Sequence, residues 1–126
     1  MARFFVCEKC GNLVGVIHSS GVPMVCCGQK MTELVPKSAE TGVEKHLPVV
    51  VVEGNVVRVN VGSVTHPMSE EHHIGWIYLE TADGGMRRAL SPTGAPEATF
   101  VLSEGERAVA AYSYCNLHGL WKTEIV

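Results

Sequence analysis

Residues 48–61 read PVVVVEGNVVRVNV, and this stretch decides the fold. Two runs rich in β-branched valine, 48–52 and 56–61, stand on either side of Glu53-Gly54-Asn55. Valine favours extended backbone, and a short turn containing glycine between two such runs is typical of a β-hairpin. The centre of the chain is therefore predicted to be a hairpin.

Five further segments after this hairpin have the length and composition of strands. They are residues 74–80, 86–90, 98–102, 107–114 and 120–126. Turn residues such as Asp83-Gly84-Gly85 separate them, and no amphipathic segment of helical length stands out. About seven short strands joined by turns are the pattern of a β-sandwich. We therefore predict an all-β protein whose residues 37–126 form an immunoglobulin-like β-sandwich.

The first 36 residues differ from the rest, because they carry four of the five cysteines and few strong core formers. A segment this short, below about 40 residues, usually needs a metal, a disulfide or a partner to stay folded. The polar, small-residue stretch 37–42 then reads as a linker. The sequence thus predicts a small metal-stapled domain, residues 1–36, followed by the sandwich, residues 37–126.

Composition excludes several classes of protein. The formal charge of −3 argues against nucleic-acid binding, which usually needs a basic patch. No apolar run approaches the ~18 residues of a membrane span, and residues 1–6 lack the features of a signal peptide. We therefore expect a cytoplasmic location, where thiols stay reduced and bind metals. A disulfide scaffold with one free thiol is disfavoured, because the adjacent Cys26 and Cys27 would rarely bridge each other.

The early cysteines form two pairs, Cys7-Glu8-Lys9-Cys10-Gly11 and Cys26-Cys27-Gly28. A Cys-x-x-Cys knuckle lets two sulfurs face one metal. Neighbouring side chains diverge in a strand, so the second pair can share that metal only at a bend, which Gly28 would permit. Four thiolates suit both zinc and iron, and a structural zinc ribbon remains an alternative at this point.

A second candidate site involves one thiolate and several imidazoles. Cys115 and His118 are spaced to chelate from one turn. The other candidates lie near predicted strand ends or in loops and are His46, His66, His72 and His73. His18 is expected to be an ordinary polar side chain. A mixed imidazole–thiolate site indicates a second metal with a redox task.

The pattern of the early cysteines resembles desulforedoxin, a small iron–tetrathiolate module. This resemblance implies one iron bound by Cys7, Cys10, Cys26 and Cys27.

The later motifs resemble the catalytic domain of superoxide reductase in its two-iron form, desulfoferrodoxin. The matching pieces are Glu44-Lys45-His46-Leu47-Pro48, His66-Pro67-Met68, Glu70-Glu71-His72 with Trp76, and Cys115-Asn116-Leu117-His118-Gly119-Leu120-Trp121-Lys122. The resemblance implies a second iron with four imidazole ligands and one thiolate, namely His46, His66, His72, His118 and Cys115. Family spacing selects His72 over its neighbour His73.

The same resemblance implies reduction of superoxide to hydrogen peroxide. It gives Lys45 the role of attracting the anion and assisting protonation, and Glu44 that of a carboxylate that reaches the ferric iron. Without the family, Glu44 and Lys45 would read as an exposed ion pair. Trp76 and Trp121 are equally compatible with core aromatics and with walls of the site.

The resemblance further implies a rubredoxin-like electron donor and a homodimer. A second copy would cover an apolar face that we expect from Phe4, Phe5, Val14 and Val16. Two alternatives remain at this stage: an electron carrier without turnover, and a structural zinc-ribbon protein. Whether the first iron relays electrons or only stabilises the fold is also open.

Overall fold

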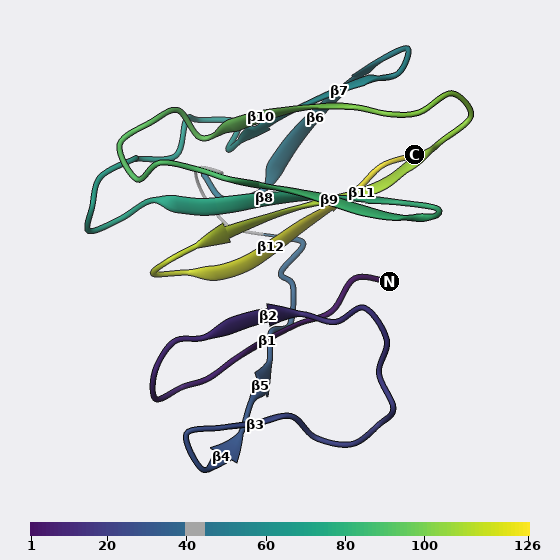
Figure 1. Ribbon diagram of the computed structural model, residues 1–126. Coiled ribbons are helices and arrows are strands. Elements are labelled where there is room, and N and C mark those ends of the chain that lie inside the picture. Colours follow the sequence, from purple (N-terminus) through teal and green to yellow (C-terminus); the bar gives the residue numbers. More distant parts are fainter. Residues whose placement is uncertain (40–44) are drawn as a thin grey trace. The chain divides into compact units, whose positions relative to one another are not determined.

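The computed structural model describes residues 1–39 and 45–126. The chain divides into two compact units, Met1–Val35 and Pro36–Val126 (Figure 1). Every regular element in the described residues is a β-strand, so the predicted all-β fold is confirmed. Glu44, one of the two predicted catalytic residues, lies outside the described residues.

The first unit is built from very short strands. Three of them, β1 (Phe4–Val6), β2 (Leu13–Gly15) and β5 (Thr32–Glu33), form a sheet in the order β2-β1-β5. The other two, β3 (Val25–Cys26) and β4 (Gln29–Lys30), form a separate hairpin. Arg3 and Glu33 tie the chain ends of this unit together through an exposed ion pair, with Nε and Oε2 2.8 Å apart.

The prediction of an uncovered apolar face on the first unit is partly wrong. Phe4 is only 5% exposed, and it packs under Gly15 rather than facing solvent. The large apolar side chains that the first unit does expose are Ile17, Val22, Met24, Val25 and Val35. The pattern of Phe4 and Phe5 gave no sign of which of the two points inward, because both are equally apolar.

The second unit contains two antiparallel sheets that pack face to face (Figure 1). One sheet has the order β10-β7-β6, and its strands are β6 (Pro48–Glu53), β7 (Val56–Val61) and β10 (Glu97–Val101). The other has the order β12-β11-β8-β9, and its strands are β8 (Ile74–Thr81), β9 (Gly84–Ala89), β11 (Ala108–Cys115) and β12 (Gly119–Glu124). The hairpin predicted from residues 48–61 is confirmed as β6 and β7, which pair from Pro48↔Val61 to Glu53↔Val56.

The core lies between these sheets and explains their strand pattern. Val57, Val59 and Val61 alternate along β7 between exposed neighbours and are at most 1% exposed. They meet Ile77 and Leu79 of the facing sheet, both fully buried. Period-two burial of this kind fixes the strand register, because a slip of one residue would expose the whole apolar face.

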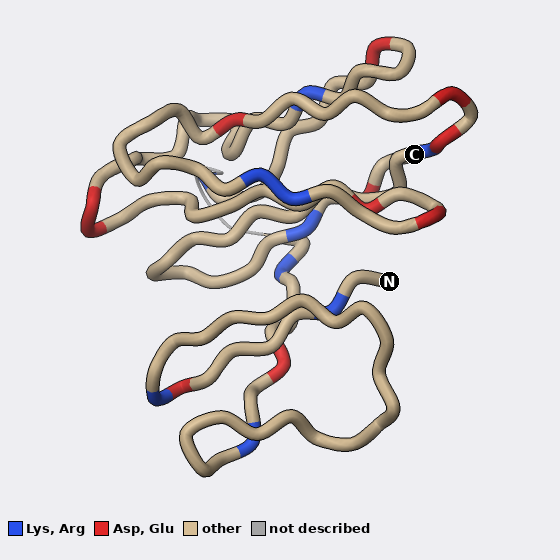
Figure 2. Tube along the Cα trace, in the orientation of Figure 1, with Lys and Arg blue, Asp and Glu red and all other residues tan. Residues whose placement is uncertain are grey.

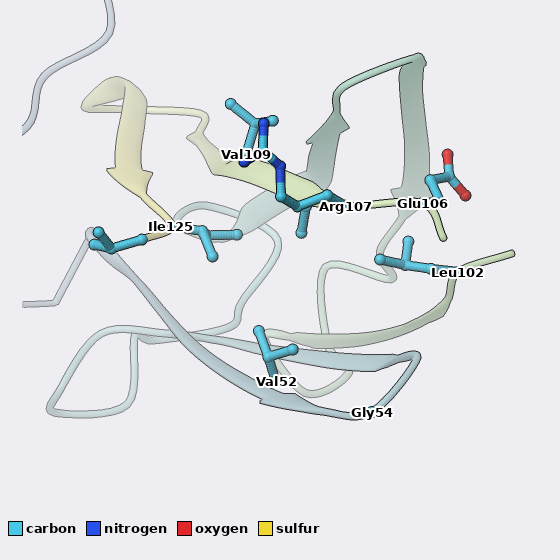
Figure 3. A pocket seen from close by; sticks show the side chains of 9 residues that line it. Val52, Gly54, Leu102, Glu106, Arg107, Val109 and Ile125 are labelled. Atoms are coloured by element: carbon cyan, nitrogen blue, oxygen red, sulfur yellow. The ribbon is translucent and has the colours of Figure 1, made fainter. Parts of the chain in front are cut away.

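The remaining surface of the second unit is mixed in character. Basic and acidic residues are interspersed along the chain trace rather than segregated (Figure 2). An apolar cavity of about 510 Å³ opens beside Val52, Leu102 and Ile125 (Figure 3). None of the candidate metal ligands lines it. No helix in the described ranges is long and apolar enough to cross a membrane.

Candidate metal centres

The four early cysteines converge in the first unit. Their sulfur atoms all lie within 4.8 Å of one another, and none is in a disulfide. Cys10 Sγ and Cys26 Sγ are 3.6 Å apart. A tetrahedral metal with bonds of about 2.3 Å to sulfur separates its ligands by about 3.8 Å, so the four sulfurs fit a single ion.

The backbone around this group is shaped for it. Gly11 N donates to Cys7 O at 2.8 Å, which closes the knuckle. At the second pair the chain bends at Cys27 (φ 53°) and Gly28 (φ 74°). The sequence predicted a bend at Gly28, but not that Cys27 itself takes the left-handed conformation, which is uncommon outside glycine. Strain of this kind persists where the surroundings enforce it, often at a ligand site.

The electrostatics of the four sulfurs also favour a cation. Backbone amides, first that of Cys10, lower the pKa of Cys7 to about 6. Hydrogen bonding to Cys10 and Cys7, together with the nearby charge of Cys10, raises the pKa of Cys27 to about 12. Four sulfurs this close cannot all ionise by themselves, and a bound metal cation removes that conflict.

A second group forms in the second unit. His46 precedes β6, His66 follows β7, His72 precedes β8, and Cys115 is the last residue of β11. Ligand atoms of these four residues lie within 4.8 Å of one another. His118 completes the group from the turn before β12, with its Nδ1 3.0 Å from His46 Nε2 and 3.6 Å from Cys115 Sγ.

The four imidazole rings lie at the corners of a near-square. Successive ring centroids are separated by 4.9 Å (His46–His66), 4.6 Å (His66–His72), 5.1 Å (His72–His118) and 4.8 Å (His118–His46). The diagonal from His46 to His72 is longer, at 6.4 Å. Nitrogens at about 2.1 Å from a metal in a square plane are about 3.0 Å apart, as His46 and His118 are.

Hydrogen bonds decide which nitrogens face inward. His66 Nδ1 donates to Pro67 O at 2.7 Å, which leaves Nε2 as the lone-pair acceptor. His66 Nε2 and His72 Nε2 are buried, and neither has a hydrogen-bond partner in the part of the chain that the structure describes. Buried polar atoms are almost always paired, so two such orphans beside a buried thiol fit a metal ion.

The protonation of the imidazoles agrees with this. Burial, helped by the charges of the neighbouring imidazoles and opposed by the hydrogen bond to Pro67, lowers the pKa of His66 to about 4. Burial likewise lowers the pKa of His72, with smaller effects from His118 and His46. Neutral imidazole is the form that binds metals.

The neighbouring residue His73 has a different environment. Its Nδ1 lies 2.9 Å from Ser69 O, and its backbone N donates to Asn116 Oδ1 at 2.9 Å. His73 is therefore held by polar contacts with Ser69 and Asn116, whereas His72 joins the imidazole square. His18 lies in the first unit, where it lines a separate cavity of about 360 Å³.

Several residues that support the site were not singled out from the sequence. Ser113, fully buried, donates from Oγ to His46 O at 2.7 Å. Asn116 joins the two loops that carry His72 and Cys115: its Nδ2 donates to Glu71 O at 2.9 Å, and its backbone N donates to His73 O at 3.2 Å.

A glycine permits the close approach of two ligand-bearing segments. Gly62 has φ 88°, and its N donates to Leu47 O at 3.0 Å. A side chain at this position would collide with the carbonyl oxygens of Lys45 and Val64. Only glycine therefore lets the segment before β6 lie against the loop that leads to His66.

The two tryptophans have different roles. Trp121 stacks on the His46 ring, with centroids 4.7 Å apart and an interplanar angle of 14°, so it is a wall of the site. Trp76 stacks instead on Tyr114 at 5.5 Å. Among the cations, Lys45 is exposed beside His46, while Lys122 Nζ lies 2.8 Å from Glu124 Oε1.

Comparison with known proteins identifies the family. The family model "Desulfoferrodoxin" matches residues 38–124, and "Desulfoferrodoxin, N-terminal domain" matches residues 2–34. A desulfoferrodoxin homolog of Archaeoglobus fulgidus is 46% identical over 123 residues, covering 96% of this chain and 95% of the relative.

Two solved structures extend the comparison. The superoxide reductase of Treponema pallidum is 34% identical with a TM-score of 0.86, and the match covers 98% of both chains. The one-iron superoxide reductase of Giardia intestinalis, also 34% identical, has a TM-score of 0.56 over 65% of this chain and 97% of its own. With two family models covering nearly all of its length, the chain belongs to the desulfoferrodoxin family.

Proposed function

We propose that this protein is a superoxide reductase. It transfers one electron to superoxide at a mononuclear non-haem iron and releases hydrogen peroxide without forming dioxygen. The observation that carries the proposal is the near-square of four imidazoles with the Cys115 thiol beside it. Its iron ligands are His46, His66, His72, His118 and Cys115.

We assign residues 37–126 as the catalytic domain and residues 1–36 as a desulforedoxin-like domain. The iron with four imidazole ligands and one thiolate ligand belongs to the catalytic domain. The other iron is bound by Cys7, Cys10, Cys26 and Cys27, whose sulfurs lie together in a fit for one tetrahedral ion. A one-iron superoxide reductase matches only 65% of this chain, which supports the proposal that the catalytic domain can reduce superoxide without the four-cysteine iron.

The residues around the second site prepare it for one-electron chemistry. Bound iron would supply one electron to superoxide, which takes up two protons to become hydrogen peroxide. Burial favours the neutral forms of His66 and His72, and Cys115, bound to the metal as a thiolate, would add one negative charge to the ligand set. Ser113 and Trp121 hold His46 by its carbonyl and its ring. A site fixed on several strand ends in this way needs little rearrangement during turnover.

We assign Lys45 and Glu44 roles in the reaction with the anionic substrate. Lys45 is an exposed cation next to His46, and it attracts an anionic substrate that the net charge of −3 would repel. It also assists protonation through ordered water. Glu44 offers a carboxylate to the ferric form and so competes with exogenous anions there.

The partners follow from the same assignment. The electron donor is a rubredoxin-like protein, and the location is the cytoplasm. The chain forms a homodimer, in which the exposed Ile17, Val22 and Val25 of the first unit are candidates for covered surface. A sedimentation mass equal to one chain at micromolar concentration would rule out the dimer.

The test uses iron-loaded protein reduced under anaerobic conditions and exposed to pulses of superoxide. One hydrogen peroxide per superoxide with no dioxygen is the expected result. One peroxide for every two superoxides, with dioxygen evolved, would make the protein a dismutase and overturn the proposal. His72→Ala should abolish the reaction and the optical band of the second iron, whereas the adjacent His73→Ala should keep both.

A spectroscopic titration separates the enzyme from an electron carrier. Azide or cyanide should perturb the ferric spectrum of the second iron, because an enzyme needs a coordination position that its substrate can enter. A spectrum unchanged by either anion would favour a carrier without turnover. A colourless protein with zinc in the four-sulfur site would favour the structural zinc-ribbon alternative for the first domain.

A further inference from the structure

The strongest observation that the proposed chemistry does not use is the position of Lys37. Lys37 is the first residue of the stretch 37–42 that the sequence predicts to be a linker. The structure instead fixes its backbone beside β12: Lys37 N donates to Leu120 O at 2.9 Å, and Lys122 N donates to Lys37 O at 2.8 Å. These bonds make a parallel bridge between Lys37 and Trp121. Because both its N and its O are hydrogen-bonded to β12, the Lys37 backbone is fixed, and so is the direction in which its side chain leaves the chain.

The side chain of Lys37 reaches the second metal site. Its Nζ donates to the carbonyl oxygen of His118 at 3.0 Å. The same Nζ lies 5.0 Å from the centroid of the Trp121 ring, and Trp121 stacks on His46. One ammonium group therefore contacts the peptide of one metal ligand and the aromatic ring that supports another.

We propose that Lys37 is a positioning and potential-setting residue of the second iron, a role that rests on the proposed function. It orients His118 through the carbonyl and places a fixed positive charge beside the ligand set. Positive charge near a metal favours the oxidation state with more electrons. Lys37 therefore raises the reduction potential of the iron and keeps it ferrous between encounters with superoxide.

Lys37 and the nearby Lys122 differ in whether a carboxylate pairs with the ammonium group. In the described residues no carboxylate forms an ion pair with Lys37, whereas Lys122 on the adjoining strand is paired with Glu124 at 2.8 Å. Lys122 also lies over the Tyr112 ring, 5.5 Å from its centroid, rather than over Trp121. Lys37 and Lys45 are both exposed, but Lys45 is next to His46 in the chain and is the residue proposed to act on the approaching anion. The chain thus offers a matched control at Lys122 and a functional contrast at Lys45.

The experiment is a redox titration of full-length, iron-loaded protein followed by the ferric absorption of the second iron. Lys37→Gln should lower its midpoint potential, shifting the ferrous–ferric equilibrium about three- to tenfold at solvent-screened distances. The tenfold limit corresponds to about 59 mV for one electron. Lys37→Arg, which keeps the charge, should stay close to the parent, and Lys122→Gln should leave the potential unchanged.

Two outcomes would overturn the inference. One is a potential in Lys37→Gln equal to that of the parent, and the other is an equal shift in Lys122→Gln. Iron content and unfolding midpoint are measured on each variant. If Lys37→Gln loses its iron, the midpoint potentials of Lys37→Arg and Lys37→Met are compared to decide whether charge is the cause. The titration reads the iron directly. A potential shift in a protein that fails to reduce superoxide would therefore support Lys37 and refute the proposed function separately.

Discussion

Asn116→Ala should weaken iron binding at the second site without unfolding the protein. The Asn116 side chain joins the loop that carries His72 to the turn that carries Cys115, through His73 N to Oδ1 and through Nδ2 to Glu71 O. Both hydrogen bonds are 2.9 Å long. Alanine removes both, and the two ligand-bearing segments then hold their spacing less firmly.

The size of the effect follows from those two bonds. A hydrogen bond contributes about 0.5–1.5 kcal/mol net, and Asn116 is exposed, so the pair contributes about 1–2 kcal/mol. Where this free energy stabilises the geometry that binds metal, its loss raises the dissociation constant for iron about 5- to 30-fold. Asn116→Asp should fall between parent and alanine, because it keeps the acceptor for His73 N and loses the donor to Glu71 O.

The assay is competition with an iron chelator, followed by the optical band of the second iron. Asn55→Ala is the matched control, because Asn55 Nδ2 also donates to a backbone carbonyl, that of Leu102, at 3.3 Å, but it joins no ligand-bearing loop. Asn55→Ala should lower stability and spare iron binding. Equal iron affinity in Asn116→Ala and the parent, or an equal loss in Asn55→Ala, would refute the reasoning.

Three further predictions concern the second unit. Lys45→Ala should slow the reaction with superoxide and weaken its dependence on ionic strength in pulse radiolysis, while Lys30→Ala in β4 serves as the control; an unchanged rate at low salt would contradict this. Gly62→Ala should lower the free energy of unfolding by at least about 2 kcal/mol in urea titrations, because its side chain meets two carbonyl oxygens; a loss below about 0.5 kcal/mol would show that the loop adapts. Burial and the hydrogen bond to Glu80 raise the pKa of Tyr112 in the folded protein. As pH rises, the tyrosine of the unfolded chain therefore ionises first, so the folded state loses stability above about pH 10 and keeps it below that pH. Tyr112→Phe should flatten that alkaline decline in unfolding free energy, and an equally steep decline would count against it.

The parts of the fold that the sequence predicted are those with local causes. The hairpin of β6 and β7 follows from valine-rich runs around a glycine turn, and the four-cysteine group follows from spacing and the need for a staple. Both signals lie within a few residues of the features they predict. The strand ends shifted by one or two residues, as at β9, because pairing partners rather than propensity set them.

The parts that could not be predicted depend on contacts between distant segments. Lys37 looked like the first residue of a linker, and only its pairing with β12 brings it to His118. Asn116 stood inside a recognisable motif, yet its partners are far away in sequence. Cys27 takes a left-handed conformation although its side chain disfavours it. In each case tertiary contacts outweigh local preference.

The separation of ligands along the chain sets an order for metal acquisition. Cys10 and Cys26 are 16 residues apart, whereas His46 and His118 are separated by 72. At about 5–20 residues per second of synthesis, the stretch from Cys10 to Cys26 takes roughly 1–3 s and that from His46 to His118 roughly 4–14 s. The four-cysteine site can therefore close around its ion while most of β6 to β12 has yet to be made. The square of imidazoles must wait for the turn before the last strand, so a growing chain is loaded from its N-terminus onward.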